Sequence, residues 1–548
     1  MTIKMQGQTL TDQSLTDRRI NPSAASTIII GALILMFSYA AVAQQGTAAP
    51  PKPSDSNHDA AYYAFRNNVD TGVTTKDPSI PRFKLSAQYP TAYPGACGPD
   101  VCPWLNQKVD FTAHFPKKGI TQKEKEERRN QETPPPDWHA DHWDAYVQSI
   151  LDYVKQGQDD NLADNVGFRT RVGGKTRWFN VPWMAYDPTA GREFVHGTTN
   201  ERTAHVAELA PGNERPLANT TAAVGAKPHH NANPDFRGTG MLAEVVSMDC
   251  EKEFPYGFET WSVGYYNEWG GYAIGKSFPR NGLPHLVDFM GSKIPDGLPF
   301  PEGTVVVKVL TTNAPTRCVK VLEGAPEWHV NRHKLAADGY DCEREVQTSR
   351  VLQVDVAVTD RRSPTHWVYS TFAYDGQSTG KTFWDRLVPL GVQWGADPWS
   401  FPAVTENTSL PLQQTVLNPE SHSIVQHYGC QGRLAGPVDN PQSSCVSCHG
   451  SAYAAPNGAP STMATNVPPS FGFDGMCIQF SLDNAAYFQN QQPPQHFPGG
   501  RFPDAISLDT SLQMEVAFDQ YGRFHTDHAP LACTDPNQIV PHTHTAGQ

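Results

Sequence analysis

The sequence reads Gly303-Thr304-Val305-Val306-Val307-Lys308-Val309-Leu310 in one stretch and Val351-Leu352-Gln353-Val354-Asp355-Val356-Ala357-Val358 in another. These two stretches decide the fold, because β-branched residues dominate both and strands favour such residues. A third strand is predicted at Trp367–Tyr374, where aromatic and β-branched residues precede the turn residues Asp375-Gly376. No long helical pattern separates the three segments. The pattern therefore predicts an antiparallel sheet or barrel rather than a parallel α/β fold.

The composition sets the class of protein. A chain of 548 residues is expected to form two or three folded units. Hydrophobic residues make up 38 % of the chain, which is enough for sizeable cores. The 47 prolines and 43 glycines disfavour long helices, so the predicted class is α+β and β-rich. The formal net charge of −13 argues against binding to nucleic acid or to an anionic membrane through bulk charge.

The mature chain divides into three predicted regions. Residues 59–230 form an N-terminal α+β region, in which a helix is expected from Pro134 to Lys155 and strands between Val166 and His196. Residues 231–405 form the β-rich region that holds the three clear strands. Residues 406–548 form a last region with short helices. Within it, the alternation from Ser511 to Phe518 predicts a strand with one buried face, and a short helix is the alternative.

The N-terminus has the pattern of an export signal. Arg18 and Arg19 precede an apolar run from Ile28 to Val42, and Ala41-Val42-Ala43 provides the small residues of a cleavage site. Residues 1–43 are therefore predicted to be a signal peptide, and residues 44–58 a linker. A twin-arginine signal and an uncleaved anchor are the alternatives. No other stretch is apolar enough to span a bilayer, so a periplasmic or otherwise exported protein is expected, with no stable membrane span after signal removal.

The ten cysteines fit an oxidising compartment. Eight of them lie outside the Cys445–Cys448 pair, which allows up to four disulfides. Cys97 and Cys102 flank Gly98-Pro99 and could close a small loop. The spacing of the other cysteines does not assign their pairing.

The sharpest motif is Ser443-Ser444-Cys445-Val446-Ser447-Cys448-His449-Gly450. On a helix, two cysteines three residues apart lie on the same side, so both thiols can add to the vinyl groups of one porphyrin. His449 then offers an imidazole to the iron, a common haem ligand. A redox Cys-x-x-Cys pair is the first alternative, but residues 430–444 lack the preceding strand that it needs. Half a zinc site is the second, but no second ligand pair has a suitable spacing.

The motif resembles the attachment site of c-type cytochromes, which Cys445, Cys448 and His449 match residue for residue. The resemblance implies one covalently attached haem c, with thioether bonds from both cysteines and His449 as the proximal iron ligand. It also implies that a downstream Met sulfur is a common sixth ligand, and Met476 is the first candidate. Met463 is the second candidate, whereas Met514 falls in a segment expected to be a buried strand. The other options are an open site or one of four histidines: His422, His427, His525 and His528.

A second resemblance rests on the order of three segments. Residues 300–308, the aromatic strand at 367–376 and a late Cys-x-x-Cys-His motif are similar to β-rich c-type cytochromes with a C-terminal motif. Those proteins include hydroxylamine-oxidising haem proteins with an open iron site and a lysine crosslink to the porphyrin. This chain is far longer than they are, and the crosslinking lysine is not assigned to Lys308.

The residues favour a haem-dependent redox function, with electron transfer as the minimum activity. The partner would be a redox protein or a small-molecule electron donor or acceptor. One alternative is a haem oxidoreductase with an open iron site, peroxidase-like or acting on a small nitrogen compound. Another is a haem-based ligand-binding protein. No catalytic constellation stands out in the sequence, so no enzyme activity is assigned from it.

Overall fold

The computed structural model describes seventeen segments of the chain, all within the unit Pro50–Gln548. These segments are 86–111, 137–162, 167–182, 194–195, 198–201, 204, 209, 248–254, 257–279, 300–336, 339–398, 412–424, 429–440, 443–454, 488–490, 506–518 and 539–541. The predicted signal peptide (1–43), the linker (44–58) and Met476 lie outside the described residues.

A mixed set of short helices accompanies many strands. The helices include η1 (Pro103–Asn106), α4 (Trp143–Lys155), α6 (Met248–Glu253), α7 (Glu268–Ser277), η4 (Lys320–Leu322), η5 (Trp384–Arg386), η7 (Pro419–Ser423), η8 (Cys430–Gly432) and α9 (Cys445–His449). The strands are β1 (Arg171–Val172), β2 (Lys175–Thr176), β3 (Phe194–Val195), β4 (Thr198–Asn200), β5 (Thr260–Tyr266), β6 (Val305–Thr312), β7 (Glu327–Ala336), β8 (Gly339–Thr359), β9 (Trp367–Tyr374), β10 (Leu387–Gln393), β11 (Thr415–Leu417), β12 (Tyr453–Ala454), β13 (Ile506–Ser507) and β14 (Ile539–Pro541).

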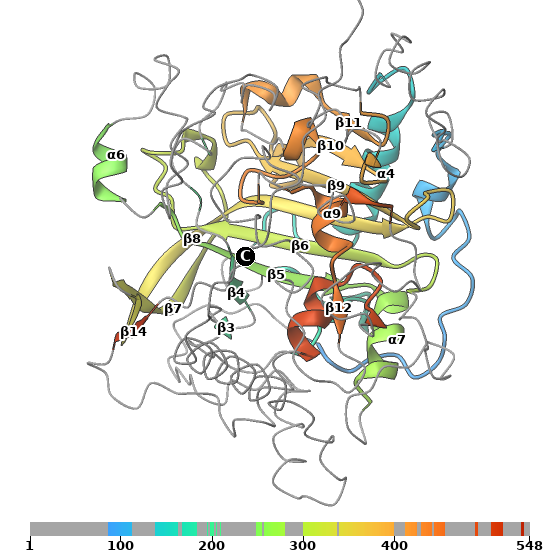
Figure 1. Cartoon of the computed structure of the whole chain (residues 1–548), viewed down its shortest axis with the longest axis horizontal. Coiled ribbons are helices and arrows are strands. Elements are labelled where there is room, and N and C mark those ends of the chain that lie inside the picture. The colour runs from blue at the N-terminus through green and yellow to red at the C-terminus, as the bar shows by residue number, and fades with distance from the viewer. Residues whose placement is uncertain are drawn as a thin grey trace, which may run out of the picture. The chain divides into compact units, whose positions relative to one another are not determined.

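One antiparallel sheet organises the molecule (Figure 1). Its strands run in the order β11-β10-β9-β8-β6-β5-β4-β3, and β7 and β14 pair with the first half of β8. The sheet has two distinct ends, so the described strands form an open sheet and not a closed barrel. The predicted β-rich α+β class and the antiparallel pairing are confirmed. The sheet takes strands from all three regions named above.

The two faces of the central strands differ in chemistry. Val305, Val307 and Val309 of β6 pair with Val358, Val356 and Val354 of β8, and all six are buried. These valines form one face of the sheet. That face and helix α4 belong to the larger hydrophobic cluster. The alternate positions carry polar groups, since Lys308 pairs with Asp355 on β8, and Asp355 pairs with Thr371 on β9. Because successive side chains of a strand point to opposite faces, these polar groups gather on the second face.

Helix α4 covers the valine face with an apolar stripe. Trp143, Tyr146, Ile150 and Val154 are all buried, as their helical spacing predicted. Trp143 stacks on Trp394, which follows β10, with ring centroids 4.2 Å apart and planes 12° from parallel. The helix begins at Trp143 rather than at Pro134, because residues 138–142 form turns and His142 has a left-handed φ of 61°.

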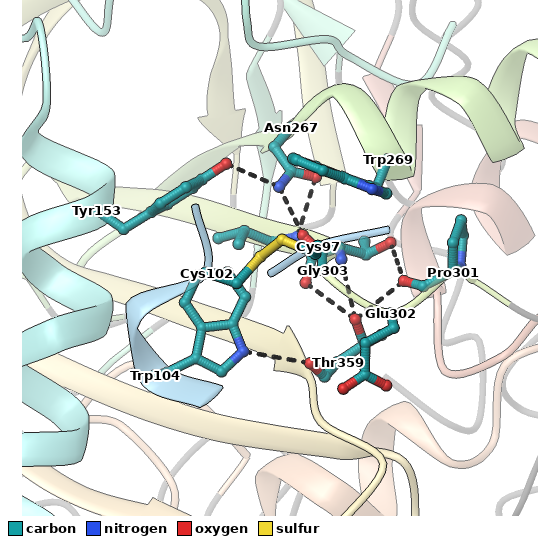
Figure 2. The surroundings of a disulfide bond; sticks show 12 residues. Cys97, Cys102, Trp104, Tyr153, Asn267, Trp269, Pro301, Glu302, Gly303 and Thr359 are labelled. Atoms are coloured by element: carbon teal, nitrogen blue, oxygen red, sulfur yellow. Dashed lines mark hydrogen bonds between the residues drawn. A yellow bond between two sulfur atoms is a disulfide. The ribbon is translucent and has the colours of Figure 1, made fainter. Parts of the chain in front are cut away.

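The Cys97–Cys102 disulfide closes a small loop that packs against Gly303, just before β6 (Figure 2). Asn267 joins the same neighbourhood, because its side chain donates to the Gly303 carbonyl (2.8 Å) and accepts from the Val305 amide (3.1 Å). Gly303 has a φ of 94°, and a Cβ there would overlap the Cys97 side chain. Only glycine fits this close approach. The small loop expected from the cysteine spacing is therefore present.

The strand prediction for Ser511–Phe518 is wrong, because residues 512–518 are helical. The Ser511 hydroxyl accepts from the Met514 amide at 3.2 Å, which satisfies a donor at the first turn of the helix. The buried positions are 514, 515, 517 and 518, which is a helical period. The apolar residues at every second position therefore misled the prediction, and the alternative of a short helix holds.

Candidate functional site

Helix α9 carries the Cys-x-x-Cys-His motif and lies over the polar face of the sheet (Figure 1). Its N-cap, Ser444, accepts from the Ser447 amide at 3.2 Å. The Cys445 amide donates to the Leu434 carbonyl (3.0 Å), and the Val446 amide donates to Gln393 Oε1 at the end of β10 (3.1 Å). The helix is therefore held by the sheet itself, although it is only five residues long.

Neither motif cysteine is paired in a disulfide. Cys445 and Cys448 are partly buried, whereas Cys97–Cys102 and Cys250–Cys318 form disulfides. The Cys445 sulfur lies 3.9 Å from the Thr371 hydroxyl of β9. Burial raises the pKa of the Cys445 thiol, and the carboxylates of Asp439 and Asp355 raise it further. Two thiols on one side of a helix are the groups that thioether attachment requires.

The imidazole of His449 has a fixed tautomer. Its Nδ1 lies 2.9 Å from the carbonyl oxygen of Thr510. A carbonyl only accepts hydrogen bonds, so Nδ1 carries the proton and Nε2 keeps its lone pair. Burial lowers the pKa of His449 to about 4, and Lys308 adds to the lowering. The ring of Tyr369 lies beside the imidazole, with centroids 4.9 Å apart. Metal-ligating histidines in proteins are neutral, and their second ring N–H donates a hydrogen bond, as Nδ1–H of His449 does here.

The acceptor of that hydrogen bond belongs to a strained pair. Asp509 and Thr510 have φ values of 48° and 67°, which side chains other than glycine rarely adopt. Asp509 is fully buried, and its carboxylate accepts from the Trp367 indole nitrogen (2.7 Å) and from the Phe300 amide. The surrounding contacts therefore hold the Thr510 carbonyl in place. No sequence pattern pointed to this pair.

A cluster of charged and polar side chains lies on the same sheet face. Lys308 Nζ lies 3.2 Å from Glu201 Oε1, and the Ser262 hydroxyl donates to the same oxygen (2.6 Å). Gln353 Nε2 donates to Asp355 (2.8 Å) and to Asp439 Oδ2 (3.0 Å). We call these six residues (Glu201, Ser262, Lys308, Gln353, Asp355 and Asp439) the polar cluster.

The polar cluster is electrostatically linked to the motif. Desolvation raises the pKa of Asp355 to about 8, with Asp439 adding to the rise and Lys308 opposing it. The charges of Lys308, Asp439 and Glu201 all act on His449. The sequence offered one signal for this cluster, namely single charges at Lys308 and Asp355 inside otherwise apolar strands. Glu201 and Asp439 come from distant segments and carried no such signal.

The structure brings Cys445, Cys448 and His449 together and leaves the sixth ligand unassigned. Met476, Met463, His427, His525 and His528 lie outside the described residues, as does the side chain of His422. Met514 is fully buried among apolar side chains in the cluster that includes Phe518 and Ala517. Within the described segments, no three His, Cys, Asp or Glu side chains gather to hold a metal ion.

Comparisons of the chain with protein-family models, with curated proteins and with solved structures found no match. Across the part of the chain that the structure describes, no helix is both long and apolar enough to cross a membrane.

Proposed function

We propose that the chain is an exported c-type cytochrome that binds one covalently attached haem and transfers electrons. Cys445 and Cys448 would form the thioether bonds, and His449 would be the proximal iron ligand. When bound, haem iron supplies a one-electron redox couple. Disulfides at Cys97–Cys102 and Cys250–Cys318 support export, because such bonds persist in oxidising compartments.

The hydrogen bond from His449 Nδ1 to the Thr510 carbonyl carries this proposal. Metal-bound histidines in proteins almost always donate their second nitrogen to a carbonyl or carboxylate, which fixes the ring and increases its basicity. A redox Cys-x-x-Cys pair would have no need of an oriented neutral imidazole next to it. A surface histidine would not be partly buried against an aromatic ring, as this imidazole is against Tyr369.

The cysteines are tested by mass spectrometry of the exported protein after denaturation. Wild type should retain one haem per chain, and Cys448→Ala should leave at most one thioether bond. Cys102→Ala is the matched control, because it removes a disulfide cysteine and should keep both thioether bonds. A Cys448→Ala protein that still holds stoichiometric haem through two bonds would refute the site assignment.

The polar cluster favours a second candidate function, a haem oxidoreductase with an open iron site. Lys308, Glu201 and Asp355 could move protons for a small bound substrate, since they lie on the sheet face that α9 covers. Carbon monoxide separates the two candidates in the reduced protein. An optical spectrum that does not change indicates a six-coordinate iron and electron transfer, whereas a shifted spectrum indicates an open site and an enzyme.

A further inference from the structure

The backbone carbonyl of Thr510 is the hydrogen-bond acceptor that orients His449 Nδ1. Thr510 offers that carbonyl from the second of two consecutive left-handed residues, Asp509 and Thr510. Such conformations persist only where the surroundings hold them. A small rotation of this pair would turn the carbonyl away from Nδ1 and weaken the hydrogen bond.

The Asp509 side chain supplies the contacts that hold the pair. It is fully buried, and Oδ1 accepts from the indole N–H of Trp367 at 2.7 Å, while Oδ2 accepts from the backbone N–H of Phe300. The Asp509 amide also donates to the Ser507 hydroxyl at 3.1 Å. One carboxylate thereby joins the start of β9, the segment before β6 and the loop that carries Thr510.

The same contacts fix what surrounds the imidazole. Trp367 is the first residue of β9, and Tyr369, two residues later, packs against the His449 ring. After Thr510, the Ser511 hydroxyl contacts the Tyr266 hydroxyl at 2.6 Å, which fixes the far end of the turn to β5. Among the side chains in these contacts, only the Asp509 carboxylate accepts two N–H groups, those of Trp367 and Phe300.

We propose that Asp509 is a positioning residue for His449, holding the Thr510 carbonyl against Nδ1 and thereby setting the reduction potential of the haem. This inference rests on the proposed function. A stronger acceptor at Nδ1 makes the imidazole a more basic ligand, which favours the ferric over the ferrous iron. Weakening that acceptor should therefore raise the potential.

The test compares Asp509→Asn with wild type in the full-length holoprotein. The amide group of asparagine can accept from only one of the two N–H groups and places its own N–H₂ against the other. The ferric–ferrous equilibrium constant should shift about tenfold toward the ferrous form, which is ~59 mV upward for a one-electron couple. Burial raises the pKa of Asp509 to about 7, so the titration is run at pH 8.5, where the wild-type carboxylate is ionised.

Asp360→Asn is the matched control for a merely structural effect. Asp360 is also fully buried and accepts from the Tyr146 hydroxyl (2.9 Å) and from Arg362 (2.9 Å). Its side-chain partners are Tyr146 of α4 and Arg362 of the turn between β8 and β9, and among the described residues no hydrogen bond joins its side chain to Asp509, Thr510 or His449. Asp360→Asn should lower stability and leave the potential unchanged.

A second variant decides the question if Asp509→Asn does not accumulate as holoprotein. Trp367→Phe removes the indole N–H that donates to Oδ1, together with part of the buried ring, and it should raise the potential by a smaller factor, about threefold in the equilibrium constant. An unchanged potential in the variants, or an equal shift in Asp360→Asn, overturns the inference while the haem assignment stands. A wild-type protein without covalent haem would instead contradict the proposed function, and this inference would fall with it.

Discussion

Replacing Asp509 by asparagine should also change how the stability of the protein depends on pH. Desolvation raises the pKa of this carboxyl to about 7, and the bonds from Phe300 and Trp367 and the charge of His366 only partly oppose the rise. In the unfolded chain the same carboxyl titrates near 3.8. Between these values the folded protein holds a proton that the unfolded chain has lost. The free energy of unfolding therefore falls as pH rises through this window.

The size of the effect follows from the two pKa values. One pKa unit corresponds to about 1.4 kcal/mol, so Asp509 should contribute a fall of about 2 kcal/mol in the free energy of unfolding between pH 5 and pH 6.5. Asp509→Asn has no proton to lose and should lack this part of the slope. Urea denaturation of both proteins at the two pH values, with disulfides intact, gives the difference directly.

Asp385→Asn serves as the control for that measurement. The hydroxyl and amide of Thr382 lower the pKa of Asp385, so this carboxyl is ionised in the folded and unfolded states throughout the window. Its variant should run parallel to wild type. Parallel curves for wild type and Asp509→Asn, or a steeper fall in the variant, would refute the reasoning.

Three further predictions concern the disulfides, the packing of α4 and the hydrogen bond that holds α9. Cys318→Ala opens a loop of 68 residues and should lower the free energy of unfolding by about 4 kcal/mol. Cys102→Ala opens a loop of five residues and should lower it by about 2 kcal/mol, so equal losses would contradict the dependence on loop length. Trp143→Ala removes the ring stacked on Trp394 and should lower the free energy of unfolding by about 3–5 kcal/mol in urea denaturation. A loss below about 1 kcal/mol would contradict tight packing of α4 on the valine face. Gln393→Ala leaves the Val446 amide of α9 without its acceptor and should cost about 1–3 kcal/mol by urea denaturation. Gln393→Glu, which keeps an oxygen there, should cost less.

Much of the sheet could be predicted from the sequence because its signals are local. The strands β6, β8 and β9 were found by their apolar and β-branched residues, and β9 matches its predicted bounds. The first half of β8 was missed, since residues 339–350 are polar and gain their strand form by pairing with β7 and β14. Pairing between distant segments leaves no periodic mark in either segment alone.

Much of the candidate site could not be predicted for the same reason. The motif at 445–449 is contiguous, so its three residues were named from the sequence. Thr510 and Asp509 come into the site only because β12 pairs with β13 and the Leu508 amide bonds to the Ala452 carbonyl at 3.0 Å. Their left-handed backbone is an effect of that tertiary setting, since neither residue is a glycine.

The most direct test of the account is the mass of the exported protein measured under denaturing conditions, for wild type and for Cys445→Ala/Cys448→Ala. Denaturation removes a haem held only by folding or by iron ligation, so only covalent attachment survives it. The account predicts one haem's mass on every wild-type chain and none on the double variant. A wild-type chain without the added mass, or a double variant that retains it, would contradict the assignment of Cys445 and Cys448 as the haem attachment site.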